Sequence, residues 1–137
     1  MATHDEHIIQ AKHNEDVAVH LSVPECKSIA WFVIVAFYAA LQYMEAALYN
    51  TSVKHSEFLA NTAGRSPHLI REDLIMLDPR TKEIYIDYKE LRKASEMFRY
   101  LKPGHNYFSE DAAKKLYDEN LQNIKNHLQA KKLIKIA

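Results

Sequence analysis

The residues whose types and spacing best suit chemistry are an arginine and a histidine in the segment RYLKPGH. Five residues separate Arg99 from His105. A guanidinium can hold a phosphate through two parallel hydrogen bonds, and an imidazole can move a proton near neutral pH. Metal-free RNA cleavage needs both groups, a cation for the phosphate and a base for the 2′-hydroxyl. We therefore predict Arg99 and His105 as candidate catalytic residues, with Arg99 holding phosphate and His105 acting as general base.

A structural role for the same two residues is the alternative. On an unbroken helix their side chains would lie about 120° apart. The break at Pro103-Gly104 is what can fold His105 back toward Arg99. Without that approach, Arg99 stabilises the carbonyls at a helix C-terminus and His105 is an exposed loop residue.

A polar stripe extends the candidate site along the same segment. Arg92, Ser95 and Arg99 follow one another at steps of three and four, which places them on one face of a helix. With Tyr100 they form a predicted RNA- or anion-binding set. The alternative is a polar patch in which these arginines pair with Glu96 or with carboxylates of another helix.

Two further groups of residues are weaker candidates. The N-terminal histidines fit no zinc-ligand spacing, so we predict no metal site and expect solvated side chains at His4, His7, His13 and His20. The aromatic residues of the most apolar segment are expected to pack in the core. A ligand pocket formed with Arg99 is the alternative for three of them, Trp31, Tyr38 and Tyr43.

Helices must position these residues. With only 2 Gly and 4 Pro, the 137-residue chain has few breakers, which favours long helices in one domain. The strongest segment, Ser28 to Tyr49, is apolar on nearly all sides, as in a buried helix. Short connections predict an all-α, up-and-down bundle of four or five helices around this long central helix. The other predicted helices are Asp5 to Leu21, the one capped by Ser66-Pro67 and ended at Asp78-Pro79, Lys82 to Leu101, and the one capped by Ser109.

Composition excludes several classes of protein. The 18 basic and 18 acidic residues give a formal net charge of zero, unlike a strongly basic nucleic-acid binder. The single cysteine, Cys26, rules out a disulfide within the chain, and no phosphate loop or other familiar catalytic motif is present. The start of the sequence is polar, and the apolar run from Ile29 to Leu41 is short for a bilayer. We expect a cytoplasmic protein with no cofactor and no membrane partner.

The order of these features resembles the HEPN superfamily. The resemblance covers about residues 14–128 and rests on AFYAALQYMEAALY, a histidine-bearing loop at His55, the helix capped by Ser66-Pro67, and IDYKELRKASEMFRYL. It implies a single HEPN-like domain over residues 1–137, a bundle that often dimerises, in toxin–antitoxin or defence systems. Many members resemble metal-independent RNases with an Arg-x(4–6)-His motif. Arg99 and His105 match that spacing, with Tyr100 where a polar residue is usual.

Three functions remain open at this stage. The first is an interaction or RNA-binding module that works as a homodimer or with a cognate partner protein. Its interface would be formed by exposed apolar residues of the first helix, Asp5 to Leu21, or of the fourth, Lys82 to Leu101. The second is a metal-independent endoribonuclease that uses Arg99 and His105. The third is a small-molecule or nucleotide-binding bundle.

Overall fold

The computed structural model describes residues 2–49, 64–105 and 108–136, and in these residues the regular structure is helical, with no strand. The α-helices are α1 (His4–His20), α2 (Ile29–Tyr49), α4 (Pro67–Leu77), α5 (Tyr85–Arg99), α6 (Glu110–Lys115) and α7 (Gln122–Ala130). The all-α prediction is confirmed. The helical turn expected at His55 to Ala60 lies outside the described residues.

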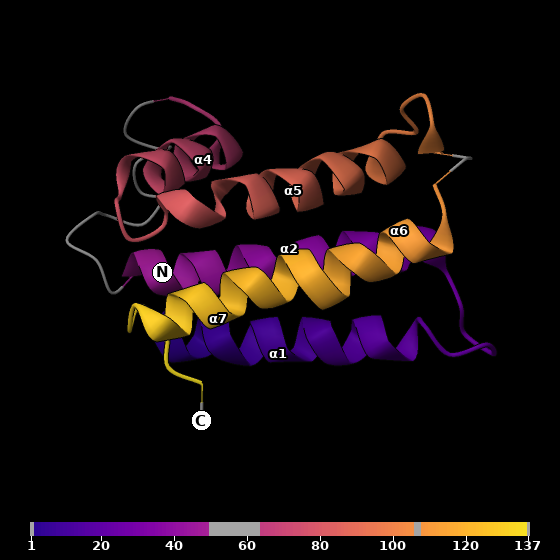
Figure 1. The fold of residues 1–137 in the computed structure, drawn as a ribbon, viewed down its shortest axis with the longest axis horizontal. Coiled ribbons are helices and arrows are strands. Elements are labelled where there is room, and N and C mark those ends of the chain that lie inside the picture. The colour runs from indigo at the N-terminus through magenta and orange to yellow at the C-terminus, as the bar shows by residue number, and fades with distance from the viewer. Residues whose placement is uncertain (1, 50–63, 106–107, 137) are drawn as a thin grey trace.

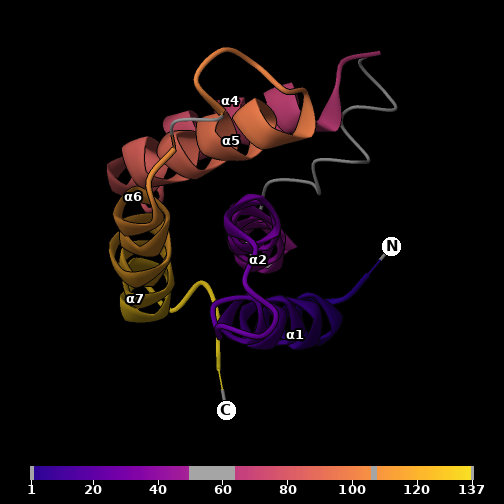
Figure 2. The same cartoon turned by 90° about the vertical axis from the view of Figure 1, so that its right-hand side faces the viewer.

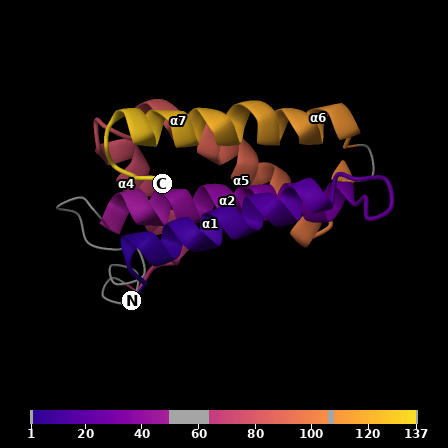
Figure 3. The same cartoon turned by 90° about the horizontal axis from the view of Figure 1, so that it is seen from below.

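The long helices run up and down around a central one (Figure 1). Seen end on, α2 lies in the middle, with α1 on one side, α5 on the opposite side and the α6–α7 segment flanking it (Figure 2). From below, α1 lies along α2, and α6 and α7 follow each other along one line (Figure 3). The predicted bundle with a long central helix is therefore confirmed.

Helix α2 is the core of this bundle. Of its 21 residues, 14 are buried, which agrees with its apolar sequence on nearly all sides. Trp31 is an exception: its side chain is 61% exposed, so the expectation of core packing is wrong for this residue. By length and composition α2 could also cross a membrane, yet 67% of its most apolar window is buried inside the protein. The predicted absence of a membrane partner stays a prediction.

Polar contacts fix α1 against the core. Thr3 and Glu6 form a capping box at its start. His7 is buried, and its Nδ1 lies 2.6 Å from Oε1 of Gln42 in α2. The expectation of a solvated side chain is therefore wrong for His7, because it lies on the face of α1 that packs on α2. On the same helix Glu15 accepts hydrogen bonds from Tyr43 and, at 2.9 Å, from Lys125 of α7.

The predicted start and end of α4 are both confirmed. The side chain of Ser66 accepts a hydrogen bond from the His68 amide, Pro67 is the first helical residue, and Asp78 ends the helix. The next helix differs slightly from the expected Lys82 to Leu101. It begins with a 3₁₀ turn, η1 (Lys82–Ile84), and α5 then ends at Arg99.

The last helix contains a π-helical segment, η3 (Leu116–Leu121), between α6 and α7. Its apolar stripe has a step of five residues between Leu116 and Leu121. In a regular α-helix this step would place the two leucines on different sides of the helix. A π turn closes i→i+5 hydrogen bonds and accommodates this step. Both leucines are consequently buried.

Candidate anion-binding site

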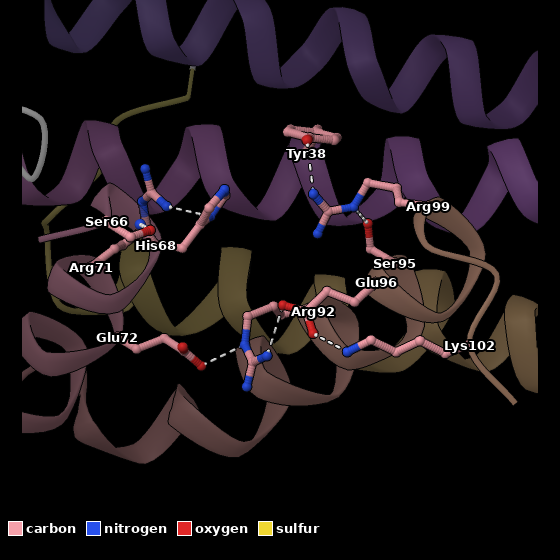
Figure 4. A network of polar contacts seen from close by, with 10 residues as sticks. All are labelled: Tyr38, Ser66, His68, Arg71, Glu72, Arg92, Ser95, Glu96, Arg99 and Lys102. Carbon is pink, nitrogen blue, oxygen red and sulfur yellow. Dashed lines mark hydrogen bonds and ion pairs between the residues drawn. The ribbon is translucent and has the colours of Figure 1, made fainter.

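Helix α5 presents the predicted polar stripe toward α2 and α4 (Figure 4). The apolar residues Tyr88 and Leu91 of α5 are buried against the core, and this packing fixes the rotation of the helix. Ser95 shares the buried face and is fully buried, whereas Arg92 and Arg99 are partly exposed at its edge. The stripe therefore lies at a boundary between core and solvent.

Arg99 is held by neutral oxygens and aromatic rings. Its Nε donates to Oγ of Ser95 at 3.0 Å, and its Nη1 donates to the hydroxyl of Tyr38 at 3.4 Å. The guanidinium carbon lies 5.7 Å from the ring centroids of Phe37 and Tyr38, and 5.2 Å from that of Tyr100. These distances are within the range of cation–π attraction. We call Arg99, Ser95, Tyr38, Phe37 and Tyr100 the Arg99 cluster.

Arg99 has no carboxylate partner in the described part of the chain, and this distinguishes it from the other arginines. Each of those forms an ion pair of 3.0 Å or less, as Arg65–Asp73, Arg71–Glu45, Arg80–Asp78 and Arg92–Glu72 or Glu96. A partly buried cation is normally neutralised by a neighbouring anion. Among the described residues, therefore, no carboxylate balances the charge of Arg99.

Arg92 is in the opposite situation. Its Nε donates to Oε1 of Glu72 at 2.7 Å, and its Nη1 donates to Oε1 of Glu96 at 3.0 Å. Lys102 also approaches Glu96, at 3.3 Å. For Arg92 these contacts favour the alternative, a polar patch paired with carboxylates of its own and another helix.

Tyr100 follows Arg99 at a strained helix end. Its side chain is 65% exposed, although its ring contacts Arg99. The next residue, Leu101, has a φ of 50°, and the amide of Lys102 donates back to the carbonyl of Met97 at 2.9 Å. This is the geometry that usually has glycine at the turning position. The sharp turn ends α5 directly after Arg99 and leaves the Tyr100 ring at the surface.

His105 is placed by the same turn but is not joined to Arg99. Its Nδ1 lies 2.9 Å from the carbonyl oxygen of Lys102. Because a carbonyl only accepts, Nδ1 carries a proton, and in the neutral form of the ring the lone pair is on Nε2. No contact between His105 and Arg99 occurs among the described residues. His105 thus has the tautomer of a base, while its approach to Arg99 remains a prediction.

His68 of α4 is a polar neighbour of the Arg99 cluster that no sequence pattern indicated. Its ring centroid lies 6.4 Å from that of Phe37, and its Nδ1 lies 3.3 Å from Nη1 of Arg71. Burial lowers the pKa of His68, and the positive charges of Arg71 and Arg99 lower it further. The only sequence signal was its place in the first turn of α4, which does not predict that this turn meets α5.

The other candidate groups do not converge on this site. Tyr43 is fully buried and bonded to Glu15, and Trp31 is exposed elsewhere on α2. A cavity of about 320 Å³ lies away from Arg99, between the end of α1, the start of α2 and α6, with Phe32 and Tyr117 in its wall. Within the described residues, no three His, Cys, Asp or Glu side chains are grouped to hold a metal ion.

Comparison with known proteins identifies no relative of this chain. The chain matches no family model, no curated protein and no solved structure. The HEPN resemblance therefore stays a prediction.

Proposed function

We propose that this chain is an RNA-binding helical module in which Arg99 holds a phosphate of the RNA backbone. The observation that carries the proposal is the state of Arg99, a partly exposed guanidinium that has neutral hydroxyl partners and no carboxylate among the described residues. Guanidinium groups bind phosphate oxygens through strong, charge-assisted hydrogen bonds.

The aromatic residues around Arg99 support RNA as the ligand. In complexes with single-stranded RNA, the bases commonly stack on tyrosine or phenylalanine rings or on arginine planes, and a nearby cation binds the phosphate. Tyr100 offers an exposed ring 5.2 Å from the guanidinium carbon. A local site of this kind is compatible with a net charge of zero over the whole chain.

The proposal is tested by fluorescence anisotropy with a labelled single-stranded RNA. Arg99→Gln should weaken binding roughly tenfold or more, because one charge-assisted contact is lost. The slope of log affinity against log salt should fall by about one, as for one lost phosphate contact. Arg65→Gln is the matched control, because Arg65 is exposed and paired with Asp73. An equal loss of RNA affinity in both variants, or no loss of affinity in Arg99→Gln, would refute the proposal.

RNA cleavage by Arg99 and His105 is the alternative for the same site. Nε2 of His105 would take the proton of a 2′-hydroxyl, whose oxygen would attack the phosphorus. The bond from phosphorus to the 5′-oxygen would break, the 5′-oxygen would take a proton from water, and a 2′,3′-cyclic phosphate would be left. The tautomer fixed by Lys102 favours this role, but the contacts among the described residues do not join His105 to Arg99. Binding is therefore the stronger proposal. Formation of cyclic-phosphate ends by the wild type and not by His105→Ala would establish cleavage.

A second candidate function is self-association through α4, as in a homodimeric interaction module. Three apolar side chains of this helix are exposed, Leu69 by 51%, Met76 by 41% and Leu77 by 78%. Leu69 and Met76 are two turns apart and so share one face, and zero net charge leaves no overall repulsion between copies. Sedimentation should show a dimer that Leu69→Glu converts to a monomer while Val19→Glu on α1 does not. A monomeric wild type at high concentration would contradict this.

A further inference from the structure

We infer that His68 is a second polar contact for the phosphate bound at Arg99. His68 and Arg99 together bind one internal phosphodiester, a monoanion, rather than a terminal phosphate. The inference rests on the proposed RNA-binding function and adds the chemical class of the phosphate to it. His68 belongs to α4 and Arg99 to the end of α5, so the site would span two helices.

The geometry brings His68 and Arg99 to the same aromatic ring. The His68 ring centroid lies 6.4 Å from the Phe37 centroid, and the guanidinium carbon of Arg99 lies 5.7 Å from it. Figure 4 shows the two side chains on either side of Tyr38, along the side of α2 that faces α4 and α5. All three side chains are partly exposed. His68 and Arg99 thus flank the same ring, and in our proposal one phosphate lies between them.

The contacts of His68 fix which of its ring nitrogens can meet a ligand. An arginine side chain only donates hydrogen bonds, so Nδ1 of His68 accepts from Nη1 of Arg71 at 3.3 Å. Arg71 is held in turn by Glu45, at 2.5 Å. The ring is then a neutral imidazole with its proton on Nε2, which has no partner among the described residues. A neutral N–H donor suits a phosphate oxygen.

The charges around the cluster match a monoanion. The positive charge of Arg71 is balanced by Glu45, and those of Arg92 and Lys102 are balanced by Glu72 and Glu96. Arg99 is the one positive charge left over in this set, and His68 is neutral. An internal phosphodiester carries one negative charge, whereas a terminal phosphate carries about −1.5 to −2 at pH 7. The diester is neutralised in this site, and a terminal phosphate would be left with excess charge.

The test compares His68→Ala and His68→Gln in the anisotropy assay with single-stranded RNA. His68→Ala should weaken binding roughly tenfold to a hundredfold, the usual size for one lost hydrogen bond to a charged group. Its salt slope should not change, because a neutral residue releases no counterion. His68→Gln keeps an N–H donor near the position of Nε2 and should restore most of the affinity. His13→Ala, at an exposed position of α1, is the control and should bind as the wild type.

The class of phosphate is tested in the same assay with one RNA bearing either a 5′-hydroxyl or a 5′-phosphate. We expect equal affinities within about twofold. A preference of tenfold or more for the 5′-phosphate would overturn the diester assignment, and full affinity in His68→Ala would overturn the role of His68. A fall of about one in the salt slope of His68→Ala would show a charged imidazole and contradict the neutral donor. In each of these cases, a loss of RNA affinity in Arg99→Gln would still support the proposed RNA-binding function. That function itself fails if Arg99→Gln binds RNA as tightly as the wild type.

Discussion

Two arginines on one face of α5 have different chemistry because their neighbours differ. Arg92 and Arg99 were equivalent in the sequence, seven residues apart. The pairing of Arg92 with Glu96 was foreseeable, since the two are one helical turn apart. The contact with Glu72 was not, because it depends on how α4 crosses α5. The absence of a carboxylate at Arg99 among the described residues follows from that packing, so the sequence predicted the stripe and left the role of each arginine open.

The ion pair between Arg71 and Glu45 is the most deeply buried one among the described residues. The side chains are 5% and 3% exposed, and Nε donates to Oε1 at 2.5 Å. We predict that Arg71→Met lowers the free energy of unfolding by about 3–5 kcal/mol, because a carboxylate stays buried without this cation. Denaturant unfolding measures the change.

Arg65→Met is the matched control for this prediction. Its ion pair with Asp73 has side chains about half exposed, 49% and 52%, and such pairs contribute about 0–1 kcal/mol. The double variant Glu45→Leu with Arg71→Met should recover much of the loss, since the buried carboxylate is then removed together with its cation. A loss below about 1 kcal/mol in Arg71→Met alone would contradict the account of a buried pair.

At the scale of the elements, the sequence predicted helices best where capping and periodicity agreed. Ser66 and Ser109 cap α4 and α6 as expected. The step of five between Leu116 and Leu121 was visible in the sequence, yet the π-helical segment was not predicted, because one irregular step is also compatible with one exposed leucine. The exposure of Trp31 was equally hidden, since it depends on which side of α2 is left uncovered by the other helices.

The π-helical segment η3 supports a prediction about length. Deletion of Glu119, an exposed residue inside η3, shortens the step from Leu116 to Leu121 to four residues. The segment can then close as a regular α-helix with both leucines still buried. We predict that this variant folds with a melting temperature close to that of the wild type, as measured by circular dichroism.

Deletion of Glu90 is the control for the effect of length alone. Glu90 is an exposed residue in the middle of α5, where the helix is regular. Its loss turns the following residues by about 100°, which would expose Leu91 and Ser95. This variant should lose its cooperative transition. An unfolded Glu119 deletion, or equal behaviour of the two deletions, would contradict the role given to η3.

For the whole molecule, the bundle was predictable, as was the polar stripe of α5, but the part that α4 adds to the site was not. One helix that is apolar on nearly all sides needs cover on several of them, and four amphipathic segments with short connections can supply it, which led to the correct architecture. The meeting of His68 with the Arg99 cluster joins residues 31 positions apart in the sequence. That meeting depends on the angle of α4, which hydrophobic periodicity does not specify. Net charge was uninformative for a related reason, because one arginine without a carboxylate partner among the described residues does not change a balanced total.

The most direct measurement is the set of arginine Nε–H resonances in an NMR spectrum, recorded while single-stranded RNA is added. The chain has five arginines, and single Arg→Lys variants assign their signals. Our account predicts that the Arg99 signal moves most, while those of Arg71 and Arg92, bonded to buried or partly buried carboxylates, move little. Saturable binding in which the Arg99 signal stays in place and others move would contradict the central claim that this residue holds the phosphate.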